Sequence, residues 1–246
     1  MKKKIMAIAL ASVIAVLAIA GATLAYLTDT DAEDNVFTFG NVAIDLYETF
    51  DEVNAKLLPA TGSAQDGTLQ NGITKEVYVT NTGSEDAYVR VHIAIPQVLD
   101  NGDPDFDATS NVLHFNYKPE TVGANKWDWS KTADDGKYEG NWNFYTAEID
   151  GKWYNVYVVT YEKALVKDEA TVDAMHQVYL DPKVTNEDVA KIAEQLGNEW
   201  HIYVAAEAAQ AAGFANAYEA LNTAFGVPGA YTVDWNAVAG VDTTKG

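Results

Sequence analysis

Four aspartates lie within one short segment, DNGDPDFD. They are Asp100, Asp103, Asp105 and Asp107. Clustered carboxylates can bind Ca²⁺ through their hard oxygen atoms. The spacing is not that of an EF-hand, because Asn111 stands where that loop requires its final glutamate. The simpler interpretation is a solvated acidic loop, and the alternative is a weak Ca²⁺ site. No other cofactor is predicted.

A second group of residues is aromatic. It consists of Trp127, Trp129, Trp142 and Trp153, which are grouped in the sequence. On an exposed sheet face such side chains stack on sugar rings, as in an extracellular carbohydrate-binding module. Tryptophan also buries a large apolar area, so packing in a core is the favoured interpretation.

Familiar catalytic patterns are missing from the sequence. None of the four histidines (His92, His114, His176 and His201) lies in an HExxH motif, which places two zinc ligands and a glutamate on one helix. No serine lies in GxSxG, and the absence of cysteine excludes thiol nucleophiles and thiolate metal sites. We therefore expect a protein that is not an enzyme. A zinc site assembled from distant segments is left open.

The first 25 residues are typical of an export signal. Lys2, Lys3 and Lys4 precede an apolar run from Ile5 to Ala20, and small residues follow as far as Ala25. We expect cleavage between Ala25 and Tyr26, which would release a secreted or cell-surface protein. The alternative is an uncleaved anchor, because the 18 residues from Ile5 to Ala22 would form a helix about 27 Å long at ~1.5 Å per residue, close to the lower limit for a membrane span.

The charge balance narrows the range of partners. The chain has 16 basic and 36 acidic residues, a net charge of −20. The expected signal contains three lysines and no acidic residue, so its removal leaves −23. Such a surface repels nucleic acid, which is therefore not an expected partner. At 48% hydrophobic residues, the chain can still form a substantial core.

Alternating apolar and polar residues predict a mainly β protein. Strands are expected at 35–47 with a break at Gly40, and at 73–80, 87–95, 112–117, 142–149, 153–161, 175–180 and 200–205. The strands at 73–80 and 87–95 look like an antiparallel hairpin, and Asp150-Gly151 is a strong hairpin turn. Helices are expected at 186–196 and 214–225. We predict one antiparallel β-sandwich domain over 26–246, with an N-terminal extension (26–38) and C-terminal helices.

Three sequence blocks resemble the TasA/camelysin type of secreted protein. The first block follows the export signal and contains Gly21, Thr23, Ala25, Tyr26, Asp29, Asn35, Phe37, Gly40, Ile44, Asp45 and Leu46. The second runs from Leu58-Pro59 through Asn81-Thr82-Gly83 to Val91, and the third is AAEAAQAAGFANAYEAL at 205–221. Residues 100–200 form a longer segment than the minimal core of that family contains at this place.

The resemblance implies a jelly-roll structural protein of a Gram-positive surface or biofilm matrix. Its partners would be a signal peptidase of the SipW type, further copies of the chain and other matrix components. Fibres of this kind grow when the freed N-terminal segment adds as a strand to the next subunit. Here the donor strand would contain Tyr26, Leu27, Val36, Phe37 and Thr38. Camelysin also carries a metallopeptidase label, although the sequence shows no recognisable zinc motif.

Overall fold

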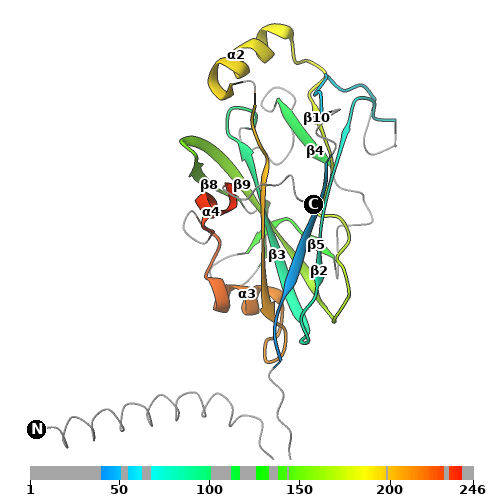
Figure 1. Cartoon of the computed structure of the whole chain (residues 1–246), viewed down its shortest axis with the longest axis vertical. Coiled ribbons are helices and arrows are strands. Elements are labelled where there is room, and N and C mark those ends of the chain that lie inside the picture. The colour runs from blue at the N-terminus through cyan, green and yellow to red at the C-terminus, as the bar shows by residue number, and fades with distance from the viewer. Residues whose placement is uncertain are drawn as a thin grey trace, which may run out of the picture. The chain divides into compact units, whose positions relative to one another are not determined.

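Segments in which apolar and polar residues alternate form strands along most of the chain (Figure 1). The strands are β1 Ile44–Phe50, β2 Ile73–Asn81, β3 Ala87–Pro96, β4 Leu113–Asn116, β5 Trp127–Asp128, β6 Ser130–Thr132, β7 Tyr138–Trp142, β8 Phe144–Ile149, β9 Lys152–Leu165, β10 Met175–Leu180 and β11 Tyr203–Gln210. The helices are α2 Asn186–Leu196, α3 Ala217–Phe225 and α4 Trp235–Ala239. The protein is therefore mainly β, as the sequence predicts.

The computed structural model describes residues 40–50, 55–62, 68–100, 112–116, 126–132, 138–142, 144–197, 199–229 and 233–239. All of them belong to one compact unit, residues 40–246. The expected export signal (1–25) and donor strand (26–38) lie outside the described residues. No helix in the described part of the chain is long and apolar enough to cross a membrane.

Two antiparallel sheets form the body of the protein. The smaller sheet has the order β1-β2-β10-β4, and the larger has the order β11-β3-β9-β5, with β8 also paired to β9. Strands β6 and β7 form a separate pair. Since all these pairs are antiparallel and the two large sheets share one core, the architecture is the predicted antiparallel sandwich.

The main core lies between the two large sheets. Alternate residues of β2, including Val77 and Val79, face alternate residues of β3 such as Val91 and Ile93, and all four are fully buried. β3 is buried on both of its faces because α3 and α4 pack on the outer face of the larger sheet. Two smaller apolar clusters there include Leu221 from α3 and Trp235 from α4. The helices thus form a third, partial layer.

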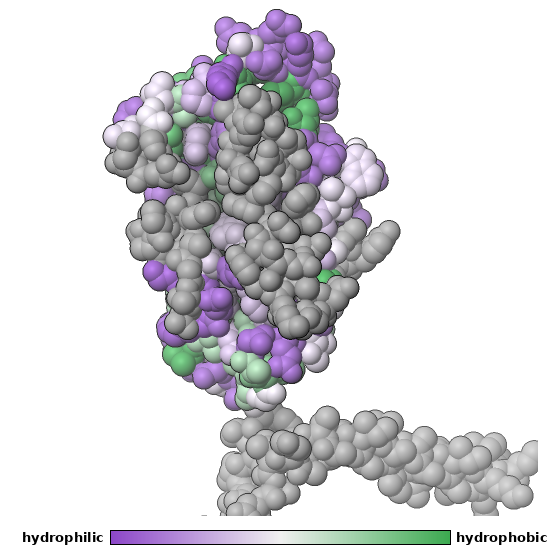
Figure 2. Space-filling model, turned by 180° about the vertical axis from the view of Figure 1, so that it is seen from behind, coloured by the Kyte–Doolittle hydropathy of each residue, from purple (hydrophilic) through white to green (hydrophobic). Residues whose placement is uncertain are grey.

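Local sequence explains where the helices begin and end. Thr185 caps α2 in a reciprocal capping box with Asp188, and Gly197 ends the helix with a positive φ of 81°. Figure 2 shows a mostly hydrophilic surface at the end of the molecule that carries α2. α3 begins later than predicted, because the side chain of Asn216 accepts a hydrogen bond from the Glu219 backbone and so fixes the N-cap there.

One predicted hairpin is confirmed and another is wrong. Asp150 and Gly151 both have positive φ and join β8 to β9 with Ile149 opposite Lys152. β2 and β3, in contrast, do not pair with each other. β2 pairs with β1 and β10, while β3 pairs with β9 and β11, so the turn after Asn81 carries the chain from one sheet to the other. A turn sequence indicates that the chain reverses its direction. It does not indicate which sheet the next strand joins.

Candidate functional site

Strand β11 forms the free edge of the larger sheet. It pairs with β3 in uninterrupted register from Tyr203 opposite Ala94 to Gln210 opposite Ala87. No strand in the described part of the chain pairs with its other side. β11 has eight residues, more than the other strands at the margins of these sheets: β1 has seven, β8 six, β4 four and β5 two. Such an edge presents a row of unpaired backbone donors and acceptors.

Small apolar side chains flank the β11 edge. Val204, Ala206 and Ala208 alternate along the strand and are only partly buried against the main core. β1, at the margin of the smaller sheet, lies close to β11 (Figure 1). Its Ile44 and Leu46 are also partly buried against the same core. Apolar surface and a free backbone edge therefore occur together on this side of the sandwich.

Strand β11 lacks the lysine, the proline and the bulge that protect many edge strands against pairing with another chain. Natural edge strands carry lysine or proline, or they are short or bulged. β11 has the sequence YVAAEAAQ, and its one charged residue, Glu207, is buried. β1 differs, since it carries Asp45 and Glu48. β11 is thus the margin best suited to accept an added strand.

A buried polar cluster fixes β11 from the outer face of its sheet. Arg90 on β3 pairs with Glu207 on β11, and Glu207 Oε2 lies 3.1 Å from His92 Nε2. Arg90 also donates hydrogen bonds to Asn222 Oδ1 at 3.0 Å and to the Gly226 carbonyl at 3.1 Å, near the end of α3. One ion-pair network therefore joins β3, β11 and α3.

The same polar cluster reaches α4 through a tyrosine. His92 Nδ1 lies 3.2 Å from the Tyr145 hydroxyl, which accepts a hydrogen bond from Trp235 Nε1 at 3.3 Å. Trp235 is buried at the start of α4. Both C-terminal helices are thus attached to the sheet through polar contacts as well as apolar packing.

Burial and charge set the ionisation of this cluster. Burial lowers the pKa of His92, and this effect outweighs the neighbouring Glu207 carboxylate, which would raise it. Burial alone would raise the pKa of Glu207, but the hydrogen bonds and charges of His92 and Arg90 lower it overall. At neutral pH the cluster therefore combines a neutral imidazole with a buried guanidinium–carboxylate pair.

The tryptophans occupy different environments. Trp127 is fully buried and donates a hydrogen bond from Nε1 to the Val172 carbonyl at 2.7 Å. Trp129 is also buried and stacks on Phe115 at 5.2 Å between ring centroids. Neither side chain is on a surface that a sugar ring could reach, so the carbohydrate interpretation does not fit these two residues. Trp153 is 56% exposed, and the Trp142 side chain lies outside the described residues.

Asp100 is not part of a solvated acidic loop. It is 2% exposed, and its Oδ2 accepts a hydrogen bond from the Tyr157 hydroxyl at 2.7 Å. Its backbone carbonyl accepts another from the Asn155 side chain. Asp100 is thus held by hydrogen bonds within the protein, and its role as a Ca²⁺ ligand stays a prediction. Asp103, Asp105 and Asp107 lie outside the described residues.

The four histidines lie in separate surroundings. His92 belongs to the buried polar cluster, and His114 is buried with its Nε2 3.0 Å from Asp181 Oδ2. His201 stacks on Tyr203. In the described part of the chain, the group of three side chains that could hold a metal ion is Glu76, Asp173 and His176. Residue spacing does not reveal this group, because Glu76 is far from the other two residues in the sequence.

Neither the protein-family models nor the curated proteins contain a match to this chain. The resemblance to the TasA/camelysin type stays a prediction that rests on the three sequence blocks described above. The cleavage site at Ala25 and Tyr26, and the donor residues Leu27, Val36, Phe37 and Thr38, stay predictions as well.

Proposed function

We propose that this chain is a secreted, non-enzymatic structural protein of a bacterial surface or biofilm matrix. Its subunits join into fibres when the N-terminal donor strand, residues 26–38, adds to the β11 edge of the next subunit. The observation that carries the proposal is the long, regular and unprotected edge of β11. The added strand would gain main-chain hydrogen bonds and cover Val204, Ala206 and Ala208.

The donor segment is long enough for this role. Its 13 residues would extend about 43 Å at ~3.3 Å per residue, whereas the eight residues of β11 extend about 26 Å. Donor residues Val36 and Thr38 fall on one side of an extended strand, and Phe37 falls on the other. One side of the donor could thus pack beside the apolar residues of β11.

The place where the donor leaves the domain also suits a head-to-tail contact. The segment before β1 is held at the turn between β2 and β3, because the Thr82 backbone donates to the Ala43 carbonyl at 2.9 Å and Ser84 donates to that of Asn41. Gly83 is needed for this close approach, since a Cβ there would lie 2.5 Å from the Asn41 oxygen. The donor therefore starts from a fixed end of the sandwich. A directional contact that does not close on itself produces a filament.

Electron microscopy of the purified protein tests whether it polymerises. With a charge of −23 after removal of the signal, subunits repel one another at neutral pH and low salt. We expect few filaments under those conditions and many at higher salt or moderately acid pH. A protein that stays monomeric across this whole range would contradict the proposal.

A further inference from the structure

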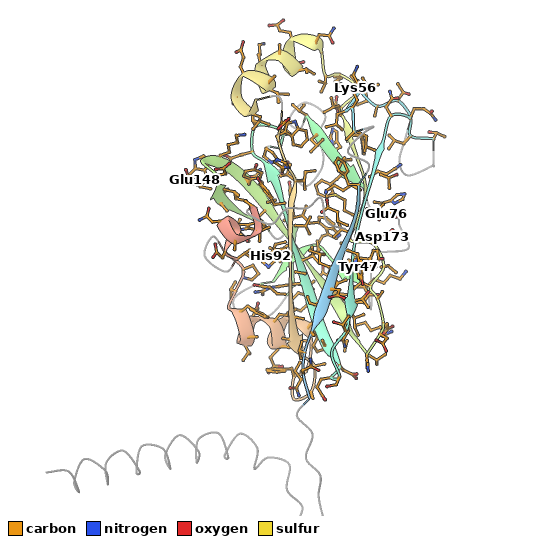
Figure 3. All side chains as sticks on the ribbon, in the orientation of Figure 1. Tyr47, Lys56, Glu76, His92, Glu148 and Asp173 are labelled. Atoms are coloured by element: carbon orange, nitrogen blue, oxygen red, sulfur yellow. The ribbon has the colours of Figure 1, made fainter. Side chains whose placement is uncertain are left out.

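We propose that Glu76, Asp173 and His176 form a binding site for one divalent transition-metal ion of the Zn²⁺ class. The site is separate from the β11 edge and does not depend on the fibre proposal. One potential ligand atom from each side chain lies within 4.8 Å of the other two. Figure 3 labels Glu76, on β2 of the smaller sheet, and Asp173, just before β10; they lie next to each other and away from His92.

An irregularity in strand pairing brings the three side chains together. Met175 pairs with Val77, but Gln177 pairs with Thr74, so two residues of β2 face the single residue His176 of β10. Such a bulge redirects side chains locally. It places the imidazole of His176 beside the carboxylate of Glu76, and Asp173 reaches the same point from the segment just before β10.

The two distances from the imidazole approach those of a metal coordination shell. His176 Nδ1 is 3.3 Å from Glu76 Oε1 and 4.0 Å from Asp173 Oδ2. Ligand atoms bound tetrahedrally to Zn²⁺ at ~2.0–2.1 Å lie about 3.4 Å from one another. The first distance already fits, and the second needs a shift of about 0.6 Å, which rotation of the Asp173 side chain could supply.

The Nδ1 atom of His176 is available to bind a metal ion. His176 Nδ1 is inaccessible to solvent and makes no hydrogen bond of acceptable geometry to any described residue, even though Glu76 is close. A polar atom that is buried without a hydrogen bond destabilises the folded state. A metal ion would satisfy the nitrogen, and the two carboxylates would neutralise the ion's double positive charge.

The ligand set favours Zn²⁺ over Ca²⁺. Ca²⁺ takes six to eight oxygen ligands, whereas imidazole suits zinc and its neighbours in the first transition series. The side chains of Glu76, Asp173 and His176 are 32%, 19% and 24% exposed, so the site lies near the surface. Bound metal would join the start of β10 to β2.

Titration of the purified, chelator-treated full chain with Zn²⁺ tests the site. In the wild type, one equivalent of Zn²⁺ should move the ¹⁵N imidazole resonance of His176 Nδ1 and leave that of His201 in place. Ca²⁺ at the same concentration should not move it. A His176 resonance that stays still, or that Ca²⁺ moves equally, would overturn the assignment. This measurement needs no substitution, so it does not depend on a variant that folds.

Calorimetry on matched variants gives a second test. We expect His176→Ala to weaken the tight binding of one Zn²⁺ by more than about 10-fold, and His201→Ala to leave it unchanged. Glu76→Gln should weaken binding as well, because it removes one anionic ligand. Equal Zn²⁺ affinity in the wild type and in folded His176→Ala would show that scattered surface carboxylates bind the metal, and would refute the site.

Discussion

Deletion of residues 28–38 is expected to leave a folded monomer that forms no filaments. The deletion retains the expected cleavage site at Ala25 and Tyr26, so export processing is kept while most of the donor strand is removed. All described strands begin at or after Ile44, so the sandwich itself should be unaffected. Sedimentation velocity and electron microscopy measure the result. Replacement of the same residues by a glycine–serine segment of equal length is the matched control, and it should also fail to polymerise.

Mixing the deleted chain with wild type makes the test sharper. The deleted chain keeps its β11 edge, so it can accept a donor strand but cannot offer one. It should therefore stop growth wherever it adds, and small amounts should shorten wild-type filaments. Normal filaments from the deleted chain alone, or no effect on wild-type filament length, would show that the contact between subunits lies elsewhere.

Substitution of Glu207 by alanine is expected to lower the free energy of unfolding by about 3–5 kcal/mol, because it leaves the buried charge of Arg90 without its carboxylate partner. The loss should also loosen α3, which Arg90 contacts through Asn222 and Gly226. Urea denaturation measures the change. Glu194→Ala, an exposed position on α2, is the control and should change the free energy by less than about 0.5 kcal/mol.

The pH dependence of stability gives an independent check on the same cluster. The folded-state pKa values of His92 and Glu207 are both lower than their ordinary values of 6.5 and 4.5. The unfolded chain therefore binds protons first as the pH falls, so acid reduces stability. The contribution of His92 to the free energy of unfolding should be complete above pH 6.5 and should decline below that pH. The contribution of Glu207 should decline below pH 4.5. A Glu207→Ala curve parallel to the wild-type curve below pH 4.5 would contradict this account.

Local patterns predicted the elements well because the responsible forces are local. The strand at 175–180 and the helix at 186–196 occur with the predicted bounds, since strand alternation, the helix cap and Gly197 all lie within the segment itself. The Asp150-Gly151 turn likewise specifies its own hairpin. In contrast, the Ala-rich stretch at 203–210, a weak strand former by composition, becomes β11 because its whole length pairs with β3.

The sites depend on partners that are distant in the sequence. Arg90 and Glu207 meet only because β3 and β11 are neighbours in the larger sheet. Glu76 and His176 meet only at an irregularity between β2 and β10, which sequence periodicity cannot reveal. The free edge of β11 is also a property of the sheet order rather than of the strand. The sequence by itself indicates a donor strand, whereas the choice of acceptor strand depends on the sheet topology.

Cysteine trapping between two variants tests the proposed contact most directly, because the chain contains no native cysteine. One variant carries Val36→Cys, Phe37→Cys or Thr38→Cys in the donor strand, and the other carries Ala206→Cys on β11. Disulfides form only when the Cα atoms are within about 7 Å. Mixed filaments should yield a disulfide between a donor cysteine and position 206 of another chain, and none when Glu194→Cys on α2 replaces the β11 variant. Filaments in which no donor cysteine links to position 206, or links equally to position 194, would contradict donor-strand addition at β11.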